Sequence, residues 1–165
     1  LSKRHPNLYS YYSHHCKSST IHCFDLWRIK ELAQIIAQDS KAHYLYFMYL
    51  CEMKRANYMA AFAYYKNYFD RVTANLDFAA GNDPRLKKPN YNMFYREGTL
   101  IRFYSGIDDG KTVIEKAHKL RNANPLSHAS SELLDSNNTS KDLCESIKAL
   151  SALIYGYIDK HKEQP

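Results

Sequence analysis

The residues best suited to chemistry lie in the stretch LRNANPLSHA, residues 120–129. Here Arg121 and Asn122 are followed by His128, seven positions after the arginine. A histidine with a pKa near neutral can move the proton of a ribose 2'-hydroxyl, and an arginine can stabilise the negative charge that develops on a phosphorane. These two residue types therefore suit the cleavage of RNA. A surface arginine and a histidine near a helix cap would explain the same spacing without any catalytic role.

The same stretch resembles the Arg-Asn-x-x-x-x-x-His signature of the HEPN ribonucleases, which are helical proteins. The resemblance implies that Arg121 and His128 are catalytic and that they meet at the seam of a homodimer. One feature argues against it. Asn124 and Pro125 break the helix between Arg121 and His128, so the sequence does not establish that the two side chains face the same way. We therefore keep a HEPN-type ribonuclease as an alternative, and our main prediction contains no catalytic residue.

A second group of reactive side chains lies near the start of the chain. The zinc-capable residues there are His14, His15, Cys16, His22 and Cys23. One zinc ion needs four such ligands in a tetrahedron, but their spacing contains neither C-x-x-C nor H-x-x-x-H. The sequence also lacks a Gly-rich phosphate loop, H-E-x-x-H and G-x-S-x-G. We therefore expect no metal site and no cofactor.

The composition is basic and rich in aromatic residues. The net charge is +6, the pI is near 9.0, and the chain holds 15 Tyr and 7 Phe. Positive charge permits a nucleic acid, an anionic membrane or an acidic protein as partner, but here the basic residues are scattered along the sequence. Tyrosines beside Lys and Arg can stack on bases, so a basic, aromatic RNA-binding helical module is a second alternative.

The four cysteines show no paired spacing, and no apolar run is long enough to cross a membrane. We therefore expect reduced thiols, a nuclear or cytoplasmic location and no membrane partner. The chain starts at Leu1 without an initiator methionine, so we expect it to be a fragment of a longer protein.

Residues 41–71 are predicted to form two helices joined by a turn at residues 55–57, and the other elements are expected to stack on this hairpin. Apolar residues recur at helical spacing in both arms, and Asn57 stands where an N-cap is wanted. A turn followed by an aromatic residue and then small alanines matches the signature of a tetratricopeptide unit. The predicted repeat positions are Leu45, Tyr49, Tyr58, Ala61, Phe62, Phe69, Gly110 and Ala117.

The predicted fold class is all-α, with antiparallel helical hairpins stacked as a tetratricopeptide-like repeat array. Residues 1–24 lack a period and are expected to be a basic, irregular arm, while residues 25–161 form the helical repeat domain. An inserted loop is predicted at about residues 74–90, which are rich in Gly, Pro, Asn and Asp. Further helices are predicted over residues 25–38, 90–104, 108–120, 125–134 and 141–161.

The central stretch resembles the tetratricopeptide region of subunit 5 of the anaphase-promoting complex. The matching elements are AHYL at residues 42–45, YFDR at residues 68–71 and EKAHKLRNAN at residues 115–124, and the likeness covers roughly residues 25–135. It implies a non-catalytic scaffold subunit of a multi-subunit ubiquitin ligase of the cell cycle, bound to other protein subunits. It would also make residues 121–128 a turn between repeats. The function we predict from the sequence is thus a protein-protein interaction scaffold.

Overall fold

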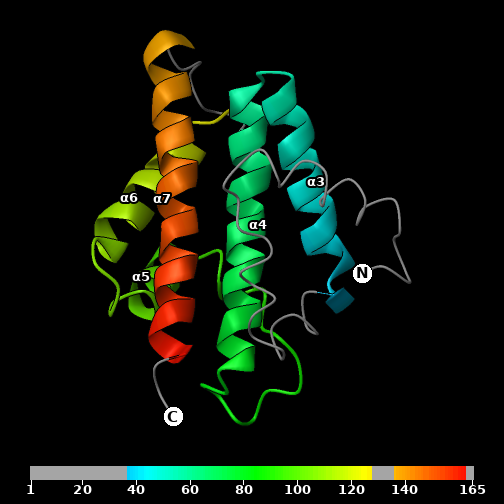
Figure 1. The fold of residues 1–165 in the computed structure, drawn as a ribbon, viewed down its shortest axis with the longest axis vertical. Coiled ribbons are helices and arrows are strands. Elements are labelled where there is room, and N and C mark those ends of the chain that lie inside the picture. Colours follow the sequence, from blue (N-terminus) through cyan, green and yellow to red (C-terminus); the bar gives the residue numbers. More distant parts are fainter. Residues whose placement is uncertain (1–36, 128–135, 163–165) are drawn as a thin grey trace.

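The computed structural model describes residues 37–127 and 136–162 of the 165-residue chain. Their regular elements are α3 (Ser40–Lys54), α4 (Tyr58–Ala79), α5 (Glu97–Phe103), α6 (Gly110–Asn122) and α7 (Ser136–Lys162) (Figure 1). This part of the chain contains no strand, so the predicted all-helical class is confirmed for it. None of these five helices is both long and apolar enough to cross a bilayer.

The predicted hairpin is present as α3 and α4, which lie side by side (Figure 1). Asp39 caps α3, because its Oδ1 accepts a hydrogen bond from the Ala42 N–H at 3.1 Å. The turn between the helices closes where the Asn57 N–H donates to the Glu52 carbonyl at 2.9 Å. Ala56 takes the left-handed conformation there, with φ at 56°.

Aromatic rings fill the seam of this hairpin. The rings of Tyr46 in α3 and Tyr68 in α4 lie 4.9 Å apart, and those of Tyr49 and Tyr65 lie 4.8 Å apart in an edge-on arrangement. Aromatic pairs of this kind contribute about 0.5–1.5 kcal/mol beyond the apolar area that they bury. Much of the tyrosine content is therefore used to hold α3 against α4.

The loop predicted over residues 74–90 is wrong in its first part, because α4 continues to Ala79. Asn75 looks like a helix breaker in the sequence, but it is fully buried and its amide donates to Asp39 at 3.2 Å. Burial on the core side keeps this part of the chain helical. The helix ends where Gly81 takes a φ of 67°, the left-handed conformation that glycine adopts at a helix end.

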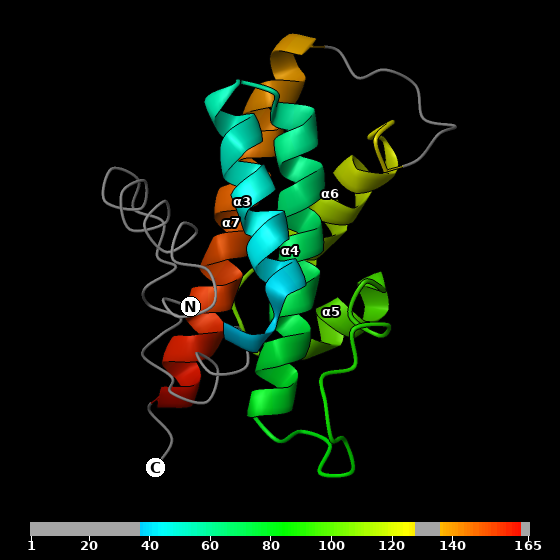
Figure 2. The same ribbon diagram turned by 90° about the vertical axis from the view of Figure 1, so that its right-hand side faces the viewer.

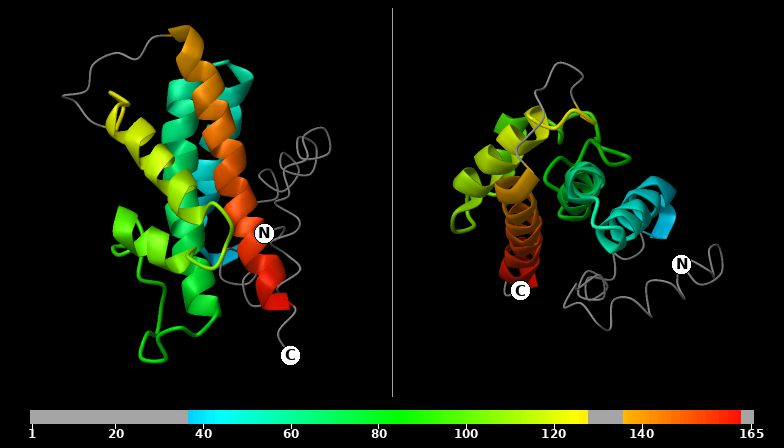
Figure 3. Two further views of the ribbon diagram at one scale, coloured as in Figure 1. Left: turned by 90° about the vertical axis from the view of Figure 1, so that its left-hand side faces the viewer. Right: turned by 90° about the horizontal axis from the view of Figure 1, so that it is seen from above.

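The predicted tetratricopeptide-like stacking is not observed. In a repeat array each hairpin contacts only its neighbours along the sequence. Here α7, the last helix, packs against α4 of the first hairpin, and α4 packs against each of the other four described helices. The view from above in Figure 3 shows α4 between α3 on one side and α6 and α7 on the other. The fold is thus a bundle around α4.

The second predicted helix pair is shorter than expected. The helix predicted over residues 90–104 is reduced to α5, and it lies beside α4 next to α6 (Figure 2). Gly110 opens α6, where a Cβ atom would lie 2.5 Å from the Tyr104 carbonyl oxygen. A small residue is needed at this position because of that close approach, so no repeat consensus is required to explain it.

Most of the residues assigned to the repeat lie in the bundle core. Tyr58 is half-buried, and the fully or almost fully buried residues are Leu45, Tyr49, Ala61, Phe62, Phe69, Gly110 and Ala117. Their helical spacing identified the inward face of each helix correctly, but it did not identify which helix that face would meet.

Other predictions fall wholly or partly outside the described residues. These include the arm over residues 1–24 with its zinc-capable residues His14, His15, Cys16, His22 and Cys23, and most of the helix predicted over residues 25–38. His128 is also outside, as is most of the helix predicted over residues 125–134, of which residues 125–127 form a turn. The last helix, α7, begins at Ser136 and so starts before the predicted residue 141.

Candidate active site

A pocket of about 550 Å³ opens between the first half of α4 and the end of α6. One stripe of α4 supplies a wall, with Asn57, Ala60, Ala63, Tyr64 and Asn67 at helical spacing. The small side chains of the two alanines leave room between the larger residues on either side of them. Glu52 at the end of α3 adds to the lining, and Arg121, Leu126 and Ser127 add to it from the end of α6 and the following turn.

Arg121, the first of the two sequence candidates, lies in the last turn of α6 and lines this pocket. Its side chain is half-buried, and its Nη1 donates to the Tyr95 carbonyl at 3.3 Å, which ties α6 to the segment before α5. A guanidinium group has five N–H donors in a planar fork that matches a phosphate. The placement is therefore suited to binding an anionic substrate group.

The segment after α6 turns back onto α4 instead of simply breaking. Asn124 is fully buried, and its Nδ2 donates to the Met59 carbonyl in the first turn of α4 at 2.9 Å. Its Oδ1 accepts from the Leu126 N–H at 3.0 Å, and the Ser127 N–H donates to the Asn124 carbonyl at 2.9 Å. This turn places Ser127 in the same pocket wall as Arg121. The helix does end before Asn124 and Pro125, as the sequence predicted, but Arg121 and Ser127 still line one pocket.

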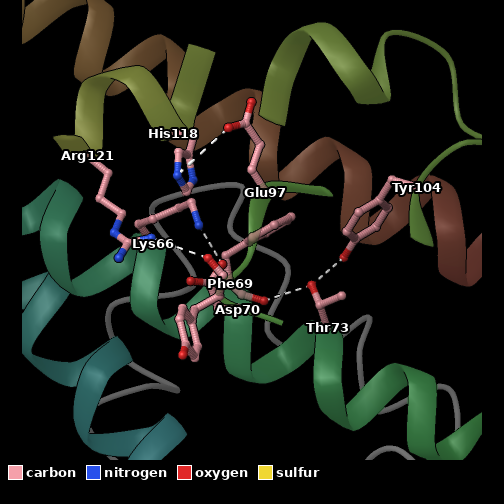
Figure 4. A network of polar contacts seen from close by, with 9 residues as sticks. Lys66, Phe69, Asp70, Thr73, Glu97, Tyr104, His118 and Arg121 are labelled. Atoms are coloured by element: carbon pink, nitrogen blue, oxygen red, sulfur yellow. Dashed lines mark hydrogen bonds and ion pairs between the residues drawn. The ribbon is translucent and has the colours of Figure 1, made fainter. Parts of the chain in front are cut away.

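A buried ion pair lies on α4 next to Arg121. Lys66 Nζ donates to Asp70 Oδ1 at 2.6 Å, and the two side chains are only 1% and 7% exposed. Figure 4 shows the side chains of Arg121 and His118 from α6 pointing toward this pair. Taking two charges out of water costs several kcal/mol per ion, so a pair at this depth is weak evidence for stability.

Asp70 is the less completely hydrogen-bonded member of this pair. Its Oδ2 is buried and has no hydrogen-bond partner within the part of the chain that the structure describes. Burial raises the pKa of Asp70 above its ordinary value, although the hydrogen bond from Lys66 and the charges of Lys66 and Arg121 oppose the rise. The charge of Arg121 thus acts on Asp70, and the carboxylate in turn favours a fixed guanidinium on the pocket wall.

His118 forms the third part of the cluster. Its Nε2 lies 3.8 Å from Glu97 Oε2, so a residue of α6 is paired with the first residue of α5. Thr73, one turn beyond Asp70 on α4, shares a hydrogen bond of 2.7 Å with the hydroxyl of Tyr104 (Figure 4). These polar contacts fix α5 and α6 against α4 and so hold Arg121 in place.

The structure describes only one of the two catalytic candidates from the sequence. It places Arg121 in a pocket, and His128 lies outside the described residues. Sequence reasoning missed Lys66 and Asp70, which look like an ordinary surface pair at positions i and i+4 of a helix. The signal that could have found them is their position among the buried tyrosines and phenylalanines of YYKNYFDR, residues 64–71.

Metal chemistry has no support in the described part of the chain. Among residues 37–127 and 136–162, no group of three or more His, Cys, Asp and Glu side chains is arranged to hold a metal ion. The cysteines described there, Cys51 and Cys144, are both free.

Comparison with known families corrects the main prediction from the sequence. Residues 30–162 match the family described as HEPN like, Abia C-terminal domain, and no curated protein matches the chain. The resemblance to the anaphase-promoting complex was therefore wrong, and so were the tetratricopeptide, ubiquitin-ligase and cell-cycle assignments that followed from it. A short match such as YFDR does not identify a family, since helical hairpins share the same periodic burial. The matched region spans most of the chain, which belongs to the HEPN-like family of AbiA C-terminal domains.

Proposed function

We propose that this domain is a ribonuclease that cleaves single-stranded RNA, with Arg121 and His128 as its catalytic residues. The observation that carries the proposal is the shared pocket, because Arg121 and Ser127 both line it. His128 follows Ser127 directly in the sequence. The family match supports the same reading, since the motif resembles the signature of the HEPN ribonucleases.

The proposed reaction uses the ribose of the substrate as its own nucleophile. His128 takes the proton of the 2'-hydroxyl as the oxygen attacks the adjacent phosphorus. The bond from the 2'-oxygen to phosphorus forms, the bond to the 5'-oxygen breaks, and the leaving oxygen takes up a proton. Arg121 stabilises the charge of the phosphorane that lies between these two states. The products are a 2',3'-cyclic phosphate and a 5'-hydroxyl.

The cluster around Asp70 supports this role for Arg121. A catalytic arginine must be held in one geometry before the substrate binds, since preorganised charges avoid reorganisation during the reaction. The Tyr95 carbonyl provides one fixed contact to the guanidinium, and the buried carboxylate of Asp70 provides a negative charge near it. Perturbed and incompletely bonded ionisable groups of this kind concentrate at functional sites.

The test is cleavage of labelled single-stranded RNA by the wild type and by Arg121→Ala and His128→Ala, at matched folding by circular dichroism. We expect each substitution to reduce the rate at least about a hundredfold, the usual range for a lost acid, base or charge-stabilising group. The matched controls are the exposed Arg102→Ala and His161→Ala, neither of which lines this pocket. Equal losses in the controls, or full activity in both test variants, would remove the two residues from the active site. RNA binding without any cleavage would instead favour the RNA-binding module.

A further inference from the structure

The pocket beside Arg121 has a second functional end. We propose that this end binds one unpaired base of the RNA, and that it prefers bases with an exocyclic amino group, such as adenine and cytosine, over uracil. The inference rests on the proposed ribonuclease function, because it assigns the part of the substrate that lies next to the scissile phosphate.

The charges of the lining divide the pocket into two ends. Arg121 comes from the end of α6, whereas Glu52 comes from the end of α3 and is 8% exposed. A buried carboxylate repels phosphate, so the phosphate is expected at the arginine and an uncharged part of the nucleotide at Glu52. Unpaired bases in single-stranded RNA are recognised in this way, by stacking and by hydrogen bonds to their edges.

The middle of the pocket has the shape and chemistry of a base-binding site. Ala60 and Ala63 leave the hollow open, and Tyr64 stands beside them on the same stripe of α4 as a half-buried aromatic platform. The exposed amides of Asn57 and Asn67 lie at either end of the stripe. Asn57 is the N-cap residue of α4 but makes no side-chain capping hydrogen bond, so its amide is not used to close the helix.

Glu52 carries the discrimination between bases. Its Oε1 accepts one hydrogen bond from Arg55 Nη1 at 3.3 Å, and a carboxylate has about four acceptor sites. An ionised carboxylate can only accept, which suits the amino groups of cytosine and adenine. Uracil presents carbonyl oxygens in place of the amino group, and these would face the carboxylate without a proton between them.

The first experiment measures kcat/KM of the full 165-residue chain on oligo(A), oligo(C) and oligo(U) of equal length. We expect adenine and cytosine to be preferred over uracil by about tenfold, the range of one good base contact. Glu52→Gln should lower that preference toward unity, because an amide can also donate to uracil. Tyr64→Ala should reduce cleavage of all three by about tenfold through lost stacking. The exposed Tyr44→Ala, outside the pocket, is the matched control and should match the wild type.

The second experiment measures binding of the same oligonucleotides by fluorescence anisotropy, which needs no cleavage. Tighter binding of oligo(A) and oligo(C) that is lost in Glu52→Gln supports the base site, whether or not the chain cleaves these oligonucleotides. If it binds them in this way but cleaves none, the ribonuclease proposal is wrong and the base site is retained. Cleavage with equal kcat/KM on the three substrates, or a preference that Glu52→Gln and Tyr64→Ala leave unchanged, would overturn the base site and leave the ribonuclease standing.

Discussion

Two carboxylates, Asp39 just before α3 and Asp70 within α4, are each only 6% exposed but differ in how well they are bonded. Asp39 Oδ1 accepts from Arg71 Nη2 at 2.7 Å and from the Ala42 N–H at 3.1 Å. Its Oδ2 accepts from Arg71 Nε at 3.0 Å and from Asn75 Nδ2 at 3.2 Å. Asp70 has the contact to Lys66 and no partner on Oδ2.

The pKa values of the two groups move in opposite directions, because Asp39 has more hydrogen-bond partners and because Asp70 lies deeper in the protein. Burial alone raises the pKa of Asp39, but the hydrogen bonds from Arg71, Ala42 and Asn75 and the charge of Arg71 outweigh it and lower the pKa. At Asp70 burial wins and the pKa rises. Asp39 therefore stabilises the fold, whereas Asp70 is paired with Lys66 through one oxygen and keeps its other oxygen without a hydrogen bond among the described residues, beside the proposed active site. Buried groups that lack partners are uncommon and usually have a functional reason.

The neighbours of Asp39 are also bonded to one another. The guanidinium of Arg71 lies 3.7 Å from the centre of the Tyr91 ring, and the Tyr91 hydroxyl donates to Asn75 Oδ1 at 2.9 Å. Burial, followed by the negative charge of Asp39, raises the pKa of Tyr91 to about 12. This closed network joins the start of α3, the middle of α4 and the segment before α5, and so has the character of a structural anchor.

The largest expected effect is the loss of that anchor. Asp39→Ala removes the α3 cap and leaves Arg71 without its carboxylate, so we expect the free energy of unfolding to fall by about 3 kcal/mol. Urea denaturation followed by circular dichroism measures it. Asp83→Ala is the control and should have no measurable effect, because the partner of Asp83 is the highly exposed Arg85. A small loss in Asp39→Ala would show that the network is not an anchor.

Replacing each ion pair by apolar residues tests the contrast itself. The double variant Lys66→Met with Asp70→Leu should be as stable as the wild type or more stable, by up to about 4 kcal/mol, since the costly buried charges are gone. The counterpart, Asp39→Leu with Arg71→Met, should lose stability because the cap and the Asn75 contact go with it. If the two double variants shifted in the same direction, the distinction between the clusters would be wrong.

Two alanines of α4, Ala61 and Ala63, allow the core and the pocket to be tested separately. Ala61 is fully buried in the core, so Ala61→Leu should cost about 1–3 kcal/mol of stability through overpacking. Ala63 lines the pocket and is half-buried, so Ala63→Leu should leave the melting temperature near that of the wild type while it lowers RNA cleavage. Thermal unfolding and cleavage rates on the two variants measure this, and equal melting temperatures would contradict the assignment.

The smallest effect is a pH dependence of opposite sign at the two carboxylates. The contribution of Asp39 is present above 3.8, its ordinary pKa, and is lost as the pH falls through its lower pKa in the folded state. Asp70 has a raised pKa in the folded state, so its ionisation costs stability as the pH rises from 3.8 through that pKa.

Urea unfolding at several pH values from about 3 to about 6 distinguishes these signs. The difference in unfolding free energy between the wild type and Asp39→Asn should grow as the pH rises over this range. The difference between the wild type and Asp70→Asn should shrink. Parallel pH profiles for the two variants would mean that the two carboxylates are bonded alike.

The sequence predicted the α3 and α4 hairpin because periodic burial, an N-cap position at Asn57 and a short turn are all local signals. It failed for the packing of α7 on α4, since amphipathic spacing identifies a buried face without its partner. It also ended α4 too early, because the buried contacts of Asn75 with Asp39 and Tyr91 are made across the fold.

The site was predicted in part for the same physical reasons. Arg121 was proposed from a motif, and the pocket that it lines depends on residues of α3 and α4 that are far away in the sequence. The helix ends before Asn124 as predicted, but the sequence did not reveal that the buried amide of Asn124 anchors the following turn on Met59. The burial of Lys66 and Asp70 follows from α5 and α6 packing over them, which no local pattern contains.

The most direct test of the proposed active site around Arg121 is end-group analysis of one single-stranded RNA and its 2'-deoxy counterpart after incubation with the wild type and with Arg121→Ala. We predict 2',3'-cyclic phosphate and 5'-hydroxyl ends from the RNA with the wild type only, and no cleavage of the deoxy strand. Cleavage of the deoxy strand, or undiminished RNA cleavage by a folded Arg121→Ala, would contradict both the chemistry and the residue assigned to it.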